Sequence, residues 1–201
     1  MRTKTALLVT AAITVFSISI GGALAYYAAQ TKTVENSFNI VAGGGASGDT
    51  VGTVDETFDP AKAVNAEPRS VIQKEAALNS NVDYSAYGYI YVTVPNANAK
   101  KGSETVKSYQ DAVTLDVDTL NWTLVKSTAG SDSVPSKYLY RYKTILAAKQ
   151  VSSKLFTKAT VPDFTEADAV SGSIDVTGYL LSSTNVSESE ADAAAVANFW
   201  S

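Results

Sequence analysis

The sequence predicts an all-β protein: a jelly-roll-like antiparallel β-sandwich with an N-terminal signal helix and one or two short helices. The composition favours strands, because eleven Tyr residues with abundant Thr and Val suit a pleated, half-buried surface. Several short segments alternate between apolar and polar residues, and turn residues separate them. Few strong helical patterns lie between these segments, which argues against an alternating β-α architecture.

The composition also limits the chemistry. The 201 residues are 45% hydrophobic and 18% charged, which is typical of a folded domain. The chain contains no Cys, so no disulfide can stabilise it, and no His, which removes the commonest general base and zinc ligand.

The charge balance is acidic, with a formal net charge of −4 that becomes −6 if Arg2 and Lys4 are removed with a leader. The only basic doublet, Lys100-Lys101, precedes Gly102 and is expected in a solvated turn. An acidic surface without basic clusters predicts neither a nucleic-acid partner nor docking on anionic lipid.

Residues 1–25 have the pattern of a secretory signal peptide. Two basic residues precede an apolar run, and Ala23-Leu24-Ala25 supplies the small residues of a cleavage site before Tyr26. The alternative is a retained membrane anchor, since residues 6–25 are about long enough to span a bilayer. We expect a secreted protein, extracellular or at the cell surface, that touches the membrane only through its signal peptide.

Residues 26–48 are predicted to form an N-terminal strand and a hinge, followed by the β-sandwich domain at residues 49–201. Within residues 31–41, Val34, Phe38 and Ile40 share one face with Asn36, while polar residues occupy the other. The tract at residues 43–48 is rich in Gly and predicts a flexible hinge.

The strongest strand is expected at residues 87–94, with Tyr on one face and Ile90, Val92 and Val94 on the other. Because both faces are bulky, this strand should be central in its sheet. Residues 96–103 are expected to be a turn region. Further strands are expected at residues 50–58, 113–117, 122–125, 138–146, 155–156 and 174–181.

Two short helices are expected, at residues 164–170 and 187–200. The second is better supported, because Ser187 and Glu190 form a capping-box pair. Ala191, Ala195 and Phe199 recur at helical spacing and form a narrow apolar stripe.

Catalytic and metal sites are not expected. A zinc peptidase needs about three ligands, usually including His, and none is present. Asp116 and Asp118 are expected on the polar, outward face of a strand, so they do not require a calcium or glycosidase interpretation. Glu188, Glu190 and Asp192 are explained by helix capping. We therefore predict a protein that is not an enzyme and binds no cofactor.

Two further patterns have structural explanations. The Tyr residues at 87–91 and 138–142 suggest sugar stacking, but cross-strand pairs or coverage of a sheet, with hydroxyls at the rim, are the favoured interpretation. The Gly tract at residues 43–48 lacks the Lys and Ser/Thr of a phosphate loop.

Several motifs occur in an order that resembles the TasA/camelysin family of exported fibre proteins. Gly21-Gly22-Ala-Leu-Ala-Tyr26-Tyr27 resembles the family's cleavage region, and Asn36-Ser37-Phe38 resembles the Asn-x-Phe that opens the mature domain. The later motifs are Ala86 to Pro95, Trp122-Thr-Leu-Val, Tyr138-Leu-Tyr140 and Leu155-Phe156. The resemblance implies a jelly-roll-like domain, a dedicated signal peptidase, and head-to-tail assembly by donation of the N-terminal strand.

The predicted function is therefore a secreted structural subunit of an extracellular fibre, in a biofilm matrix or a pilus-like filament. Its partner is a second copy of itself, or another fibre subunit, and Val34, Phe38 and Ile40 form the donated interface. The alternatives are a monomeric secreted module that binds a carbohydrate or cell-surface ligand, and a minor or anchoring fibre subunit.

The leader generates the first testable prediction. Secreted material should begin at Tyr26, because the peptidase requires small side chains at positions 23 and 25. Intact-mass measurement of the exported protein checks this, and recovery of membrane-bound protein that retains residues 1–25 would contradict it.

Overall fold

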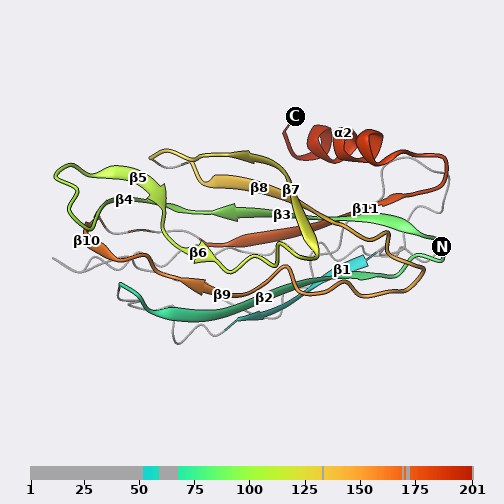
Figure 1. Cartoon of the computed structure of the whole chain (residues 1–201), viewed down its shortest axis with the longest axis horizontal. Coiled ribbons are helices and arrows are strands. Elements are labelled where there is room, and N and C mark those ends of the chain that lie inside the picture. The colour runs from blue at the N-terminus through green and yellow to red at the C-terminus, as the bar shows by residue number, and fades with distance from the viewer. Residues whose placement is uncertain (1–51, 59–67, 133, 169, 171–172, 201) are drawn as a thin grey trace, which may run out of the picture.

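The computed structural model describes residues 52–58, 68–132, 134–168, 170 and 173–200, and in these residues the chain is all-β with a single helix. The strands form three antiparallel sheets (Figure 1). The first sheet has the strand order β1 (Gly52–Phe58), β2 (Val71–Ser80), β9 (Phe156–Thr160) and β6 (Thr114–Leu115). The second sheet has the order β11 (Asp175–Ser182), β3 (Ala86–Val94), β8 (Ser136–Tyr142) and β7 (Trp122–Thr128). The third sheet has the order β10 (Phe164–Ala167), β4 (Asn96–Lys101) and β5 (Ser108–Asp111).

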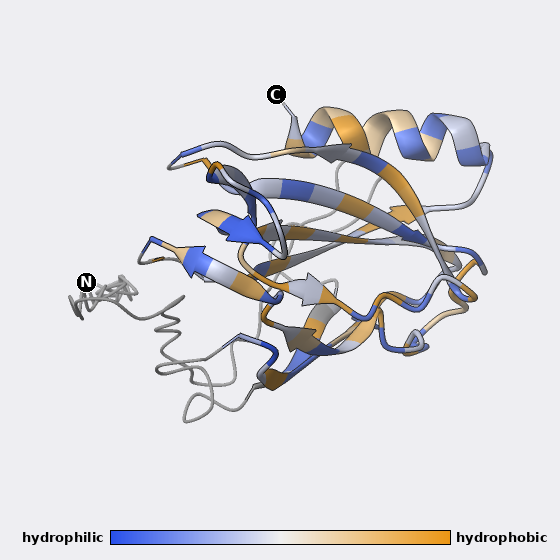
Figure 2. Cartoon of the chain, turned by 60° about the vertical axis from the view of Figure 1, so that its left-hand side comes forward, coloured by the Kyte–Doolittle hydropathy of each residue, from blue (hydrophilic) through white to orange (hydrophobic). Residues whose placement is uncertain are grey.

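The main core is lined by both four-stranded sheets. Ile72, Leu78 and Phe156 enter it from the first sheet, and Ile90 and Leu180 enter it from the second. The strands show alternating hydrophobic and hydrophilic bands (Figure 2), as expected where one face of each strand is buried.

A second apolar layer lies on the opposite face of β3. Tyr87 and Tyr89 belong to this layer, whereas Ile90, Val92 and Val94 belong to the main core. β3 pairs with β11 on one side and β8 on the other, so it is central in its sheet. The prediction of a central strand with Tyr on one face is confirmed.

The helix α2 (Glu188–Phe199) covers this Tyr face (Figure 1). Its capping box is confirmed: Glu190 N–H donates to Ser187 Oγ, and Ser187 N–H donates to the Glu190 carboxylate. Ala191 and Ala195 are fully buried, and the ring of Phe199 stacks on Tyr91 with centroids 4.5 Å apart. The predicted helical stripe is therefore the docking face.

An ionic contact orients the helix within this apolar interface. The buried guanidinium of Arg141, on β8, lies 2.5 Å from the Glu188 carboxylate and 3.0 Å from that of Asp192. The Tyr89 hydroxyl donates to Asp192 at 2.9 Å. These contacts compensate the burial of one positive charge, which would otherwise be strongly destabilising.

Three predictions of local structure are wrong. Residues 164–170 were expected to form a helix, but residues 164–167 form β10, which pairs with β4 through an irregular register while Phe164 enters the core. Residues 96–101, expected in a turn, form β4, because Ala97 and Ala99 are small enough to be buried completely. Lys100 and Lys101 end this strand rather than occupying a loop.

The third error concerns Asp116 and Asp118. β6 contains only two residues, so these carboxylates follow the strand and do not form an outward strand face. Each accepts hydrogen bonds from neighbouring backbone groups instead. β1 and the strands β7, β8, β9 and β11 overlap the segments predicted as strands, whereas β2 and β5 have no counterpart in the prediction.

The core face of β3 generates a stability prediction. A Cβ atom at Gly88 would lie 2.7 Å from Leu78 Cδ2 and 2.8 Å from Leu146 Cδ1. Gly88→Ala should therefore lower the free energy of unfolding by about 1–3 kcal/mol through overpacking. Chemical denaturation measures this, and Leu146→Ala in the same chain should recover part of the loss. Strictly additive costs for the two substitutions would contradict the proposed clash.

Candidate functional site: an open sheet edge

All the site residues predicted from the sequence lie outside the described residues. These are the cleavage residues Ala23, Ala25 and Tyr26, and the donor-strand residues Val34, Phe38 and Ile40. The described residues instead show which strands lie at the borders of the sheets. Strands at the border of a sheet present an unpaired row of N–H and C=O groups, and this row is where another strand can add.

On one side of the molecule, the chain passes directly from one four-stranded sheet to the other. β6 and β7 border the two four-stranded sheets there, and residues 116–121 connect them. Asp118 N–H donates to the Leu155 carbonyl at 2.7 Å, and Trp122 N–H donates to the Asp118 carbonyl at 3.0 Å. This connection leads from one sheet to the other and is held by hydrogen bonds to the β9 side and within itself.

Asp116 attaches that connection to β9. Its carboxylate accepts hydrogen bonds from Thr157 N–H at 2.8 Å, Lys158 N–H at 2.7 Å and the Thr157 hydroxyl at 2.6 Å. Burial raises the pKa of Asp116, but these donors outweigh it, and the net pKa lies below the ordinary value. The ionised carboxylate of Asp116 is thus the form that holds residues 116–121 to β9.

On the other side of the molecule, the first and the last strand of the described chain lie near each other. β1 borders one sheet and β11 borders the other, and the two strands approach each other at this edge. Among the residues described, β1 pairs only with β2 and β11 pairs only with β3. Each strand is therefore the last one of its sheet in the described part of the chain.

A buried ion pair joins the border strand β1 to its neighbour β2. Lys74 is on the core face of β2, between Ile72 and Ala76, and its Nζ lies 3.2 Å from Oε2 of Glu56 on β1. The Lys74 and Glu56 side chains are only 5% and 9% exposed. Burial raises the pKa of Glu56, Lys74 lowers it, and nearby Asp175 raises it further, with a net increase. The pair carries a desolvation cost that an apolar pair would not have.

Glu56 also has an unused acceptor. Its second oxygen, Oε1, is buried and accepts no hydrogen bond from any described residue. Such an atom typically costs about 1–3 kcal/mol relative to a satisfied one. The border strand β1 therefore carries one buried carboxylate oxygen that a further donor would stabilise.

The sequence analysis did not identify this pair. The available signal was Lys74, which shares its parity with Ile72, Ala76 and Leu78, all of which are buried. A single charge on an otherwise apolar strand face indicates a buried partner. Its partner could not be named, because Glu56 reaches Lys74 only through the β1–β2 register.

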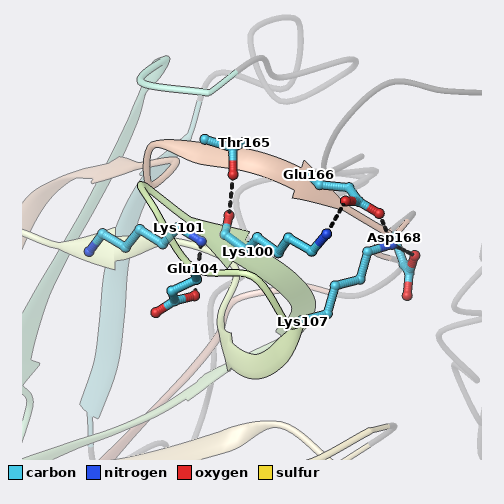
Figure 3. Close-up of polar contacts among 7 residues, drawn as sticks. All are labelled: Lys100, Lys101, Glu104, Lys107, Thr165, Glu166 and Asp168. Atoms are coloured by element: carbon cyan, nitrogen blue, oxygen red, sulfur yellow. Dashed lines mark hydrogen bonds and ion pairs between the residues drawn. The ribbon is translucent and has the colours of Figure 1, made fainter.

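A larger cluster of charges lies on β4, β10 and the turn after β4 (Figure 3). Lys100 contacts Glu166 at 2.7 Å, and Lys107 contacts Glu166 at 3.0 Å and Asp168 at 2.6 Å. Both carboxylates are about half exposed, so solvent screens these contacts and each contributes little. We interpret the cluster as a surface network that holds the two strands together.

The Tyr residues are covered rather than presented to solvent-borne sugars. The rings on β3 lie under α2, and Tyr138, Tyr140 and Tyr142 on β8 pack against the main core. The two sets therefore occupy opposite faces of one sheet. Two aromatic pairs lie across neighbouring strands in the described residues: Tyr89 with Tyr179, whose centroids are 5.9 Å apart, and Tyr142 with Trp122, at 5.0 Å. The Tyr89 hydroxyl is buried rather than at a rim, because Asp192 accepts its hydrogen bond.

No group of three or more acidic residues in the described segments has the geometry to hold a metal ion. Within the same segments, no helix has the length and apolar character needed to cross a membrane.

Comparison with known proteins adds no relative: no family model matches the chain, and neither the curated proteins nor the solved structures contain a match.

The hydrogen bonds between Asp116 and β9 generate a prediction about the pH dependence of stability. Because the pKa of Asp116 is lower in the folded protein, its contribution is present above the unfolded value of about 3.9 and is lost as the pH falls through the folded value. Asp116→Asn should cost about 1 kcal/mol at pH 7, since solvent screens this exposed carboxylate. The difference from wild type should shrink below about pH 4.

Denaturation between about pH 2.5 and pH 7 measures this effect. Asp83→Asn is the matched control, because its side chain is exposed at the surface and makes only a solvent-screened contact with Lys149. A pH-independent difference between wild type and Asp116→Asn would contradict the assignment.

Proposed function

We propose that this chain is an exported structural subunit that polymerises head to tail into an extracellular fibre. The strand at residues 31–41 of one subunit extends the sheet of the next at the outer side of β1. The observation that carries the proposal is that β1, the first described strand after the donor segment, lies at the border of its sheet. Addition of an edge strand is an established mode of protein recognition.

The strand order supports a jelly-roll-like sandwich as the architecture. β2, β9 and β6 are neighbours in one sheet and β11, β3 and β8 in the other, so consecutive strands repeatedly cross between sheets. Such folds consist of two antiparallel sheets that face each other across a core. The two sheets that line the main core fit this description.

The donor is supported by the sequence. Residues 31–41 alternate, with Val34, Phe38 and Ile40 on one face, and they resemble the opening of the mature domain in the TasA/camelysin family. A strand that leaves its own subunit for a neighbour makes a heterologous contact that does not close, and such contacts build filaments. Cleavage before Tyr26 by a dedicated signal peptidase would release this segment.

The role is structural rather than catalytic in this proposal. The chain offers no His or Cys for acid–base or nucleophilic chemistry, and the proposal assigns it no cofactor. The partner is a second copy of the chain, or another subunit of the same fibre. The location is extracellular or at the cell surface.

A second candidate uses the same edge within one subunit. Ten residues, 42–51, separate the donor segment from β1. An extended chain of this length spans about 35 Å at most, enough to fold back beside its own β1 as well as to reach a neighbour. The result would be a monomeric secreted module, with the same contacts made in cis.

Phe38 distinguishes the two candidates. Loss of a buried Phe typically costs about 3–5 kcal/mol, and an aspartate in its place adds an unpaired charge. Phe38→Asp should therefore raise the concentration needed for filament assembly at least about 100-fold. Ser37→Asp, on the other face of the strand, is the matched control and should assemble within about threefold of wild type.

Electron microscopy and light scattering of the chain from Tyr26, at rising concentration, measure assembly, and thermal melting measures the monomer. In the fibre proposal, Phe38→Asp prevents filaments and leaves the monomer melting temperature nearly unchanged. A wild type that stays monomeric under all conditions, with Phe38→Asp lowering its melting temperature, would instead establish the monomeric module.

A further inference from the structure

We infer that Asn185 is the acceptor of an N-linked glycan, which is attached as the chain leaves the cytoplasm. The inference goes beyond fibre assembly and rests on the proposed function in one respect, because it requires export. It assigns a covalent modification site to the turn between β11 and α2 (Figure 1).

The sequence contains two triplets of the acceptor type, in which Asn is followed two residues later by Ser or Thr and the middle residue is not Pro. They are Asn121-Trp122-Thr123 and Asn185-Val186-Ser187. In an exported protein such a triplet accepts a glycan on its Asn side chain, provided that it lies at an accessible surface. The surroundings of the two triplets therefore decide between them.

Asn185 lies in an exposed turn between the last strand and the helix. Its φ angle is 58°, a conformation that Asn adopts more readily than most residues. Its side chain makes no hydrogen bond to another described residue. The side-chain nitrogen Nδ2 is therefore accessible to an enzyme while the domain stays folded.

The turn is attached to the sheet on both sides of Asn185. Before it, the backbone N–H and the hydroxyl of Ser183 both donate to the Ser85 carbonyl at 3.0 Å. After it, the Tyr87 hydroxyl donates to the Val186 carbonyl at 3.2 Å, and the Val186 side chain packs against the second apolar layer. Asn185 is thus presented at the surface by neighbours that remain fixed.

The hydroxyl that the acceptor triplet requires is also at the surface. Ser187 is exposed, and its Oγ donates to the Glu190 carboxylate at 2.6 Å and accepts from Glu190 N–H at 3.4 Å. Opening of this cap breaks only exposed hydrogen bonds and leaves Ala191 and Ala195 buried. The Ser187 hydroxyl is therefore available to a transferase while α2 remains docked.

The other triplet has the opposite surroundings. Nδ2 of Asn121 donates to the Asp118 carboxylate at 2.8 Å, and the Asn121 carbonyl accepts from Lys143 N–H at 2.9 Å. Trp122 is only 2% exposed, and Thr123 belongs to β7, which pairs with β8. Presentation of this triplet to an enzyme would remove Trp122 from the core, so we do not expect Asn121 to be modified.

The transfer requires a membrane-bound transferase and a sugar donor that is linked through phosphate to a polyprenyl lipid. Nδ2 of Asn185 forms a bond to the anomeric carbon of the first sugar, while the bond between that carbon and the phosphate oxygen breaks. The proton lost from Nδ2 is balanced by the negative charge gained by the departing lipid phosphate. The chain supplies only the acceptor, so this reaction needs no catalytic residue of its own.

The residues of the triplet also have structural roles, but those roles do not require an acceptor triplet. Asn or Gly fits the positive φ at position 185, and Ser, Thr, Asp or Asn caps a helix at position 187. Only Asn at the first position together with Ser or Thr at the third makes an acceptor. Substitutions that keep each structural role and remove the acceptor are therefore possible.

Mass spectrometry of the chain isolated from the cells that produce it tests the inference. The intact mass should exceed that of the polypeptide by one glycan, and fragmentation should place this glycan on Asn185. Ser187→Asp keeps a capping side chain but removes the hydroxyl, so the added mass should be lost completely. Ser187→Thr keeps both, so the added mass should remain.

A second pair of variants compares the two triplets. Asn185→Gly suits the positive φ and should remove the added mass. Asn121→Gln is the matched control, because it destroys the other triplet while keeping an amide, and should leave the added mass unchanged. Thermal melting of each variant confirms that loss of the glycan is not loss of the fold.

The outcomes separate the modification from the fibre. An unmodified wild-type chain overturns this inference, and so does an added mass that persists in Asn185→Gly or Ser187→Asp. Filaments of an unmodified chain would leave the proposed function intact. A modified chain that never assembles would overturn the fibre and leave Asn185 as the acceptor in an exported monomeric protein.

Discussion

The architecture depends on the burial of β3 on both faces. Ile90 and Val92 on one face require an opposing sheet, and Tyr87, Tyr89 and Tyr91 on the other require a cover. Both demands are met with β3 in the interior of its sheet, between β8 and β11. Two apolar layers then follow on either side of a single sheet (Figures 1 and 2).

The two layers are closed in different ways. Between the sheets, large aliphatic and aromatic side chains fill the core. Under α2, Ala191 and Ala195 let the helix approach the Tyr rings closely, and Arg141 is buried only because Glu188 and Asp192 lie at the same face. The C-terminal segment is therefore fixed by specific contacts, while at β1 one buried oxygen, Oε1 of Glu56, accepts no hydrogen bond from the described residues.

The sequence predicts the elements whose side chains alternate or whose ends are capped. β3, β8 and α2 are of this kind, because Tyr alternation and the Ser187–Glu190 pair are local signals. β2 is not, since Ala76, Ala77 and Leu78 are consecutive buried residues and Lys74 interrupts the apolar face. β4 and β10 depend on each other, because Ala, Asn, Lys and Glu have weak strand preference and the pairing decides their state.

The same limit applies to the candidate site. The donor pattern can be seen in one segment, whereas the Glu56–Lys74 pair exists only after two segments are paired.

The separation into two layers places the two tryptophans in different surroundings. Trp122 is buried in the main core against Tyr142, while Trp200 lies at the end of α2, where its Nε1 donates to Thr128 and Lys126 lies over its ring. Indole emission depends on local polarity and on neighbouring charges. The intrinsic fluorescence of the protein is thus the sum of two signals, one from the space between the sheets and one from the helix layer. Replacement of either indole by Phe isolates the other and reports whether the helix separates from the sheet before the core opens.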